Sequence, residues 1–550
     1  ETKGRSQATG RRRQLALEAR SPGLDLHPLG TDWLTHSGLA LTLDADMPLR
    51  TKSLPQVEAH GTLRLTHSVV RGVGLAPVEV HARLHEGTVR FDAHCADSLA
   101  RFDLEGRVKT ADSLRGYYAD LDIRRLQADR FGMLPPQFGP VSGHATANFK
   151  GNRIDEMQGG LTLQGTEAGQ ARLDALTLTV RADEGQKNIR LESDALSATV
   201  GGRFAYADLP LMARRMVDKV VPPELHPDTP PDSSAYAAIE GSNINFNLQW
   251  NDNGRLLHAI APRLTVARGT RLSGSYNHTE LLKVALRSDS VRVGGVMLAD
   301  VGVSSRLDGN TYRLVAETPS VAAGRRELVR HVVASLACNG TEATAGLDWG
   351  SPSDDSEGEV ELRLAQGLVS VAKPGFRLGQ SLWTLDIDSL AVKGGQRMQL
   401  EGRGIGMHNE EQSIDARLRL RGEADDHIEL SFDHFMLAIL NQTLLPKTRI
   451  NASGRMDGHF SMYGFGQTPY FNANLTVDSC VVNHQQLGLI SVRSNWNAEL
   501  NTLNLQVGSR HLNAHGWVGL GQHDPELNFA VDFNNFELAM AAPFMATFAK

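Results

Sequence analysis

Apolar and polar residues alternate with a period of two along almost the whole chain. Apolar side chains occupy every second position in Val78–Leu84, and the same pattern returns in Ile244–Trp250 and Phe471–Val477. Successive side chains of a β-strand point to opposite faces of its sheet, so each of these segments would bury one face and expose the other. Strands of this kind are typical of antiparallel sheets. The alternation therefore predicts an all-β fold built from many antiparallel strands.

Length and composition narrow this prediction. At 550 residues the chain is longer than a single core usually supports, so we expect several domains or an elongated array. Its 53 glycines suit many turns between short strands, and its 41% of hydrophobic residues excludes a disordered chain. The 56 basic residues are dispersed among 63 acidic ones, which argues against a surface that binds nucleic acid.

One supersecondary unit recurs along the chain. Ile428–Gly464 runs from a strand-like segment through the apolar stretch Phe435–Leu440 to a second strand, and Leu121–Gly151 and Ala530–Lys550 repeat this layout in looser form. Repeated units of this size indicate an array in which each unit packs on its neighbours. We expect Phe435–Leu440 to form a short helix or crossover that caps the apolar lining.

A single helix interrupts the predicted strands. Segment 209–221 has an apolar face at helical spacing and a proline in its first turn. It is followed by a proline-rich stretch, 222–238, which we interpret as a linker or an exposed loop. The chain thus divides into strand repeats over 1–221, the proline-rich stretch, and further repeats over 239–550 that include a polar loop at 350–358.

The sequence contains no recognisable catalytic or cofactor-binding motif. The signatures of phosphate loops, hydrolase nucleophile elbows and zinc proteases are absent from it. His81 and His85 would share one face of a strand, but no third ligand is spaced to complete a metal site. The scattered cysteines Cys95, Cys338 and Cys480 provide no disulfide scaffold. We therefore expect a protein that is not an enzyme and that needs no cofactor or metal.

The single apolar face of these strands can be buried in two ways. Two sheets can pack face to face around a closed core, or one twisted sheet can curl into a groove with an apolar lining. Alternation alone leaves both arrangements open. A groove would suit acyl chains, because each buried methylene contributes about 0.8 kcal/mol without directional contacts. The predicted lining residues are Leu176, Leu178, Val180, Leu196, Ala198, Val200, Ile244, Phe246, Leu248, Leu418, Leu420, Leu475, Val477, Leu503 and Leu505.

Several motifs make the chain similar to a known family. Ser453–Gly458 and Gly139–Gly151 resemble the glycine-bearing strand of repeats in the AsmA-like superfamily. Leu173–Val180, followed by Ile189–Pro210, resembles more specifically the large TamB-like envelope proteins of Bacteroidetes-type bacteria. In those proteins a similar run leads into a short helix and a proline-bearing stretch. The resemblance favours the groove over the closed core.

The resemblance implies a role in the bacterial envelope. TamB-like proteins, named for the translocation and assembly module, are anchored in the inner membrane. Their periplasmic β-groove extends toward the outer membrane and is associated with phospholipid transport and with outer-membrane protein assembly or secretion. The implied partners are phospholipid acyl chains and an outer-membrane barrel assembly partner.

We expect this chain to be an internal fragment of such a protein. The membrane anchor and the region that contacts the barrel partner would lie outside it, since no stretch reaches the ~18 apolar residues needed to cross a bilayer. The alternative is a non-lipid periplasmic scaffold or chaperone that holds outer-membrane β-strands by pairing at its sheet edges.

Overall fold

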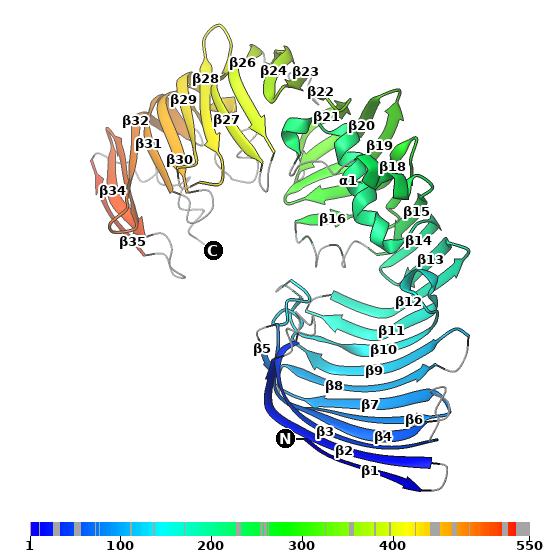
Figure 1. The fold of residues 1–550 in the computed structure, drawn as a ribbon. Helices are drawn as coiled ribbons and strands as arrows, with labels where there is room; N and C mark the ends of the chain where they lie inside the picture. Colours follow the sequence, from blue (N-terminus) through cyan, green and yellow to red (C-terminus); the bar gives the residue numbers. More distant parts are fainter. Residues whose placement is uncertain are drawn as a thin grey trace. The chain divides into compact units, whose positions relative to one another are not determined.

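The computed structural model contains two compact units, which are described separately. Unit 1 comprises Glu1–Leu209, Ile239–Thr279 and Val291–Gly294, and unit 2 comprises Pro210–Ala238, Glu280–Ser290 and Gly295–Lys550. The structure describes residues 2–9, 12–25, 34–48, 57–71, 73–75, 77–110, 113–135, 138–169, 171–226, 233–252, 257, 261, 263–324, 326–350, 357–378, 381–394, 398–423, 425–439, 451–464, 470–482, 485–519 and 526–534. Most of these residues form antiparallel strands (Figure 1), which confirms the predicted all-β fold.

Unit 1 is a meander in which most strands pair with the next strand along the chain, as the blue-to-cyan ribbons of Figure 1 show. Its strands are β1 (Thr2–Thr9), β2 (Arg12–Asp25), β3 (Leu34–Pro48), β4 (Glu58–Val70), β5 (Val73–Leu75), β6 (Val78–His85), β7 (Thr88–Ala96), β8 (Ala100–Lys109), β9 (Gly116–Leu126), β10 (Val141–Lys150), β11 (Gln158–Ala168), β12 (Ala171–Asp183), β13 (Gln186–Ser193), β14 (Leu196–Arg203), β15 (Asn243–Trp250), β16 (Leu264–Val266) and β17 (Arg271–Asn277). Two short 3-10 helices, η4 (Ile154–Glu156) and η5 (Tyr206–Asp208), accompany them.

Unit 2 continues the same pattern of antiparallel strands. They are β18 (Leu281–Val293, whose last residues belong to unit 1), β19 (Val296–Asp308), β20 (Thr311–Ala323), β21 (Arg326–Cys338), β22 (Glu342–Gly350), β23 (Gly358–Ala365), β24 (Leu368–Lys373), β25 (Gly375–Leu378), β26 (Ser381–Lys393), β27 (Gln399–His408), β28 (Ser413–Leu420), β29 (His427–Met436), β30 (Ala452–Tyr463), β31 (Tyr470–Val482), β32 (Gln485–Asn497), β33 (Thr502–Ser509), β34 (Leu512–Gly519) and β35 (Leu527–Phe533). Helix α1 (Leu209–Val220) lies where the sequence predicts a helix, over 209–221. The proline-rich stretch after it contains η6 (Pro223–Leu225) and most of η7 (Ser233–Ile239), whereas most of the predicted loop at 350–358 lies outside the described residues.

The strand register aligns apolar side chains in rows that cross the sheet. Directly paired residues share a face of an antiparallel sheet, so a row of apolar partners makes a continuous apolar face. One such row in unit 1 consists of Ala147, Leu161, Leu178, Leu191, Ala198, Leu248 and Leu272. A corresponding row in unit 2 consists of Ile387, Ile405, Ala416, Leu430, Phe460 and Ala473. We call this side of each sheet the apolar face and the opposite side the polar face.

In unit 2 the sheet curls toward its apolar face. Trp383 on β26 and Phe435 on β29 both belong to this face, and β27 and β28 lie between them. Side chains that stand upright on a flat sheet three strand spacings apart would be separated by about 14 Å. The two ring centroids are instead 6.5 Å apart. The convergence of these rings shows that the strands bend around the apolar face and form a groove.

Two copies of the predicted repeat share a distinctive bulge. The strand register shifts beside Gly143 in the first copy and beside Gly454 in the second. The backbone φ angles at these glycines are 146° and 133°, a region that L side chains rarely adopt. A β-carbon would also lie 2.8 Å from Thr166 Oγ1 and 2.9 Å from the Asp478 carbonyl oxygen, respectively. Both copies therefore require glycine here, while the third copy lies almost wholly outside the described residues.

In both copies residues at or just after the end of the first strand cover the strand ends of the apolar face. Phe131 packs on Cys95 and Ala100 in unit 1, and Phe435 packs in a cluster with Trp383 in unit 2. Leu437 and Ile439 pack against the second cluster, and the Leu437 amide donates a 2.9 Å hydrogen bond to the Gly454 carbonyl. Phe435 and Met436 end β29 instead of beginning the expected short helix; Ala438 and Ile439 are helical, and Leu440 lies outside the described residues.

Residues 209–226, comprising α1 and η6, form a third cover, which we call the strap. Val220 of the strap packs in a buried cluster with Leu281, Tyr312, Cys338, Ala343 and Leu364, and Met216, Val221 and Leu225 flank it. The Val220 and Glu224 carbonyls accept hydrogen bonds of 3.1 and 2.5 Å from the amides of Gly340 and Gly394. The strap is thereby bound to the links at the ends of strands β21 and β26.

Replacing Trp383 by alanine should destabilise unit 2 by about 3–5 kcal/mol, because a fully buried indole at the centre of its cluster would leave a cavity. The neighbouring Leu382 is 67% exposed and points to the other face, so Leu382→Ala should change stability by at most about 0.5 kcal/mol. Chemical denaturation followed by far-UV circular dichroism, which reports on the strands and not on the replaced indole, measures the free energy of unfolding of both variants. Equal effects of the two substitutions would contradict the assigned faces.

Candidate functional site

The predicted lining residues all lie on the apolar face, but the structure divides them between the two units. Nine belong to strands β12, β14 and β15 of unit 1, and six belong to β28, β31 and β33 of unit 2. Leu178 pairs with Leu191, which pairs with Ala198, so neighbouring strands bring these side chains into contact range. Val180, Val477 and Leu503 are buried, and the remaining lining residues are partly exposed.

Strands β21 and β22 carry exposed leucines on the apolar face. Leu336 and Leu347 lie on this face, one or two rungs from the cluster beneath the strap, and their side chains are 39% and 45% exposed. Long apolar side chains on one face of paired strands are usually covered by a second layer. No described element packs over these two leucines, so this part of the apolar face is accessible to an apolar ligand.

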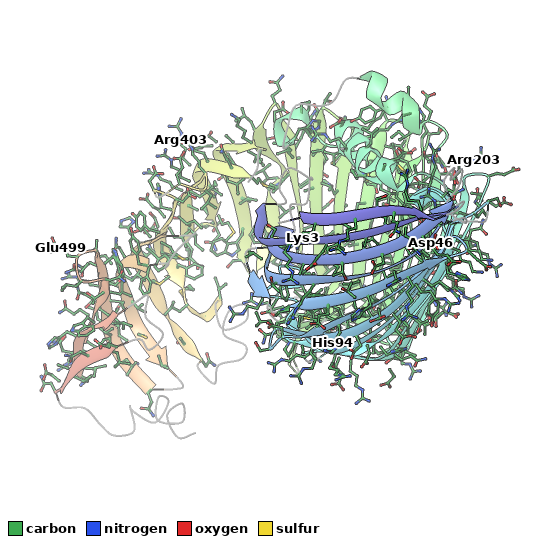
Figure 2. The ribbon with its side chains drawn as sticks, turned by 60° about the horizontal axis from the view of Figure 1, so that its bottom comes forward. Lys3, Asp46, His94, Arg203, Arg403 and Glu499 are labelled. Carbon is green, nitrogen blue, oxygen red and sulfur yellow. The ribbon has the colours of Figure 1, made fainter. Side chains whose placement is uncertain are left out.

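The polar face carries charged side chains that pair with one another across strands. His94 Nδ1 lies 2.5 Å from Asp103 Oδ1, and Arg124 lies 2.8 Å from the other carboxylate oxygen. The hydrogen bond from His94 and the charge of Arg124 hold the pKa of Asp103 below its usual range. Figure 2 shows His94 among the side chains that project from the sheet of unit 1. The face is therefore a hydrated surface of satisfied charges.

The histidines considered from the sequence lie on this polar face. His81 and His85 are exposed on β6, and His85 lies 3.6 Å from Glu58 on β4. Charged and polar residues, among them Arg83 and Arg90, line an open hollow of about 1080 Å³ here. Ion pairing with acidic neighbours accounts for His85, and the part of the chain that the structure describes gathers no ligand set around His81.

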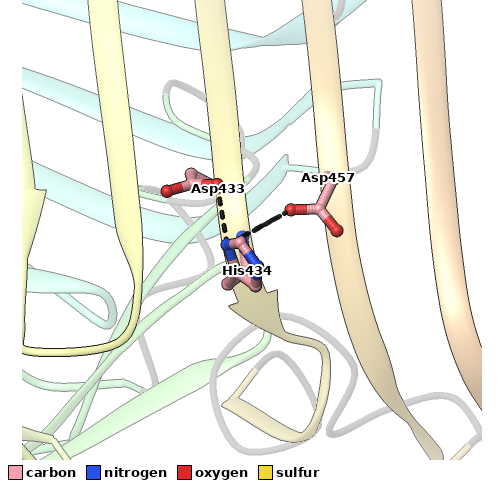
Figure 3. A group of neighbouring side chains, drawn as sticks. All are labelled: Asp433, His434 and Asp457. Carbon is pink, nitrogen blue, oxygen red and sulfur yellow. Dashed lines mark hydrogen bonds and ion pairs between the residues drawn. The ribbon is translucent and has the colours of Figure 1, made fainter.

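One group of three potential metal ligands exists among the described residues, at the bulge of β29 (Figure 3). His434 Nδ1 lies 2.7 Å from Asp433 Oδ1, and Asp457 Oδ1 accepts a 2.7 Å hydrogen bond from the His434 amide. His434 has a φ of 55°, so the Asp457 carboxylate stabilises a strained backbone position. The three side chains, of which Asp457 is half-buried, satisfy one another, and we assign them this structural role.

A buried lysine that sequence reasoning missed fixes the chain just before the strap. Lys187 Nζ lies 3.0 Å from Asp155 Oδ1 and 4.9 Å from the ring centroids of Phe204 and Tyr206. It also donates a hydrogen bond to the Phe204 carbonyl. The Tyr206 amide and Lys187 hold the pKa of Asp155 below its usual range. Together these contacts clamp the segment between β14 and α1.

The comparisons with known proteins identify no relative. No family model matches the chain, and no curated protein matches it. Among the described residues, no helix is long and apolar enough to cross a membrane. The resemblance to TamB-like proteins therefore remains a hypothesis, and the apolar face itself is the observation from which a function can be argued.

If the apolar face is open at Leu336, a charge there should be tolerated. Leu336→Glu should change the stability of unit 2 by less than about 1 kcal/mol, because the carboxylate reaches water. Leu364→Glu, on the same face but buried under the strap, should destabilise it by several kcal/mol, because it buries an unpaired charge. Urea denaturation of both variants tests this. A large loss of stability in Leu336→Glu would indicate a closed core.

Proposed function

We propose that this chain binds phospholipid acyl chains along the apolar face of its sheet. The observation that carries the proposal is the exposure of Leu336 and Leu347 on two paired strands, on a face whose rows of apolar side chains continue from strand to strand. Acyl chains need apolar surface without directional partners, and each methylene removed from water contributes about 0.8 kcal/mol. The opposite, hydrated face would remain in contact with water while lipid is bound.

We further propose that the chain is a periplasmic segment of a TamB-like envelope protein. It would be anchored in the inner membrane by a segment outside this chain, would contribute to phospholipid transport toward the outer membrane, and would act with an outer-membrane barrel partner in protein assembly or secretion. The support is the unit that recurs at Leu121–Gly151 and Ile428–Gly464. In it a strand and a segment that covers the strand ends are followed by a second strand with a bulged glycine, and this is the feature that resembles the family. The proposed role is binding and guidance, without a catalytic residue.

A photo-crosslinking amino acid at position 178 should capture phospholipid in cells, whereas the same group at position 179 should not. Leu178 lies on the apolar face, paired with Leu161 and Leu191, and Thr179 points to the polar face beside Arg190. Mass spectrometry of the adducts identifies the captured lipid. A crosslinker at Thr179 is the matched control because it differs by one residue along the same strand.

Equal labelling at the two positions would contradict lipid binding by the apolar face. Capture of outer-membrane protein segments at strand edges, with no lipid at position 178, would instead support the alternative scaffold that holds β-strands by edge pairing. The two outcomes are distinguished in one experiment because the adducts differ in mass.

A further inference from the structure

Beside the paired charges of the polar face, a row of three arginines crosses the sheet of unit 1. Arg83 on β6 lies directly opposite Arg90 on β7, and Arg90 lies directly opposite Arg107 on β8. All three side chains are exposed. Like charges that stand directly opposite one another on paired strands destabilise a sheet. The strand register therefore brings three guanidinium groups together although their repulsion opposes it.

Other arginines on the polar face pair with a carboxylate two residues away on the same strand. Arg20 lies 2.8 Å from Glu18 on β2, and Arg190 lies 2.5 Å from Glu192 on β13. Residues at this spacing share one face of a strand, so an arginine side chain can reach the carboxylate. An arginine of this sheet can thus have its charge neutralised within its own strand.

The arginine row does not use the same opportunity. Arg90 and Arg107 have carboxylates at this spacing, Asp92 and Glu105, and form no ion pair with them. Among the residues that the structure describes, none of the three guanidinium groups has an ion pair or a hydrogen bond. Arg107 instead lies over the ring of Tyr118, 5.5 Å from its centroid. The donors of the row are therefore available to a ligand.

The row lines a hollow that is open to water. Arg83, Arg90 and Arg107 all contribute to its wall, and its volume is about 1170 Å³. Because neighbouring strands lie about 4.8 Å apart, the three arginines follow one another over about 10 Å. A ligand of that length can contact all three guanidinium groups at once.

The surroundings of the row limit the kind of anion that fits. At one end of the row, His60 lies 3.4 Å from Asp44 and is part of an ion pair. The exposed Lys109 flanks the row on one side, and Asp92 and Glu105 flank it on the other. A long polyanion would extend over these carboxylates and be repelled, whereas a compact anion can contact the row and the lysine.

Guanidinium groups in such a row are suited to phosphate. Each one presents a planar fork of donors, and one fork already occupies both oxygens of a carboxylate. A terminal phosphate group has three free oxygens and a higher charge, so two neighbouring arginines can bind it together. Three arginines in succession can therefore hold two linked phosphate groups.

We propose that the row of Arg83, Arg90 and Arg107, with Lys109 beside it, binds a compact anion that carries two or more phosphate groups. A soluble oligophosphate and a lipid headgroup with two phosphates offer this same chemistry. The bound phosphates would neutralise the repulsion between the arginines, so the ligand stabilises the register that positions it. The row lies on the face opposite the acyl-chain site, and the inference does not rest on the proposed function.

Isothermal titration calorimetry of the whole chain with tripolyphosphate tests the site. The wild type should bind, and Arg90→Gln should weaken binding about tenfold, the order expected when hydrogen bonds to a charged group are lost. Arg190→Gln is the matched control, because it removes the same charge from the same face but from an arginine that is already paired with Glu192. This control should bind tripolyphosphate as the wild type does.

Removing a flanking carboxylate should have the opposite effect. Asp92→Asn should tighten the binding of tripolyphosphate, because the phosphate groups would no longer lie beside a negative charge. Glu192→Gln makes the same change of charge away from the row and should leave the affinity unchanged. An Asp92→Asn variant that binds no more tightly than Glu192→Gln would contradict the placement of the anion on this row.

Phosphatidylcholine vesicles with and without cardiolipin, whose headgroup carries two phosphates, distinguish the two sources of the ligand. Sedimentation of the wild type, but not of Arg90→Gln, with the cardiolipin vesicles would assign the phosphates to a lipid headgroup. Binding of tripolyphosphate without such sedimentation would assign them to a soluble anion. Either result supports the site, provided that the binding depends on Arg90.

A wild type that binds neither probe, or equal weakening by Arg90→Gln and Arg190→Gln, would overturn the proposal. If Arg90→Gln fails to fold, as judged by circular dichroism, Arg83→Gln takes its place in the same comparison. Lipid capture by a crosslinker at position 178 should be the same in all of these variants, since that position lies on the apolar face. Failure of the phosphate site and failure of the proposed function are therefore separate results.

Discussion

The alignment of apolar side chains across neighbouring strands is the constraint on which this structure depends. A shift of one residue in any strand would turn its apolar side chains to the hydrated face, so the pairing register and the two-sided character of the sheet are determined together. Rows such as the one through Leu161, Leu178 and Leu191 continue from strand to strand with no second sheet required to complete them. The result is apolar surface that is organised but only partly covered.

Local covers decide where that surface is sealed. Phe131, just after β9, and Phe435, near the end of β29, cover strand ends of the apolar face, and the strand that follows each of them carries a bulged glycine. The strap also covers this face, with a helix, and is held by apolar packing and two main-chain hydrogen bonds. Between these covers Leu336 and Leu347 remain exposed, so the fold combines stable, capped stretches with an accessible one.

Period-two alternation was sufficient to predict the strands and the faces of all fifteen lining residues, and apolar residues at helical spacing predicted the helix at 209–221. It did not single out Leu336, because the register shift between Arg330 and Val333, with His331 at a φ of 50°, interrupts the alternation within β21. It also could not reveal the contact of Lys187 with Asp155, which joins residues far apart in sequence.

The central claim is that the apolar face accepts acyl chains while the sheet stays folded. Native mass spectrometry of the chain, purified from the envelope of a double-membraned bacterium without added lipid, tests it most directly. The account predicts folded protein with bound phospholipid masses that are lost on collisional activation. Folded protein that carries no lipid, and that takes up none from phospholipid vesicles, would contradict it.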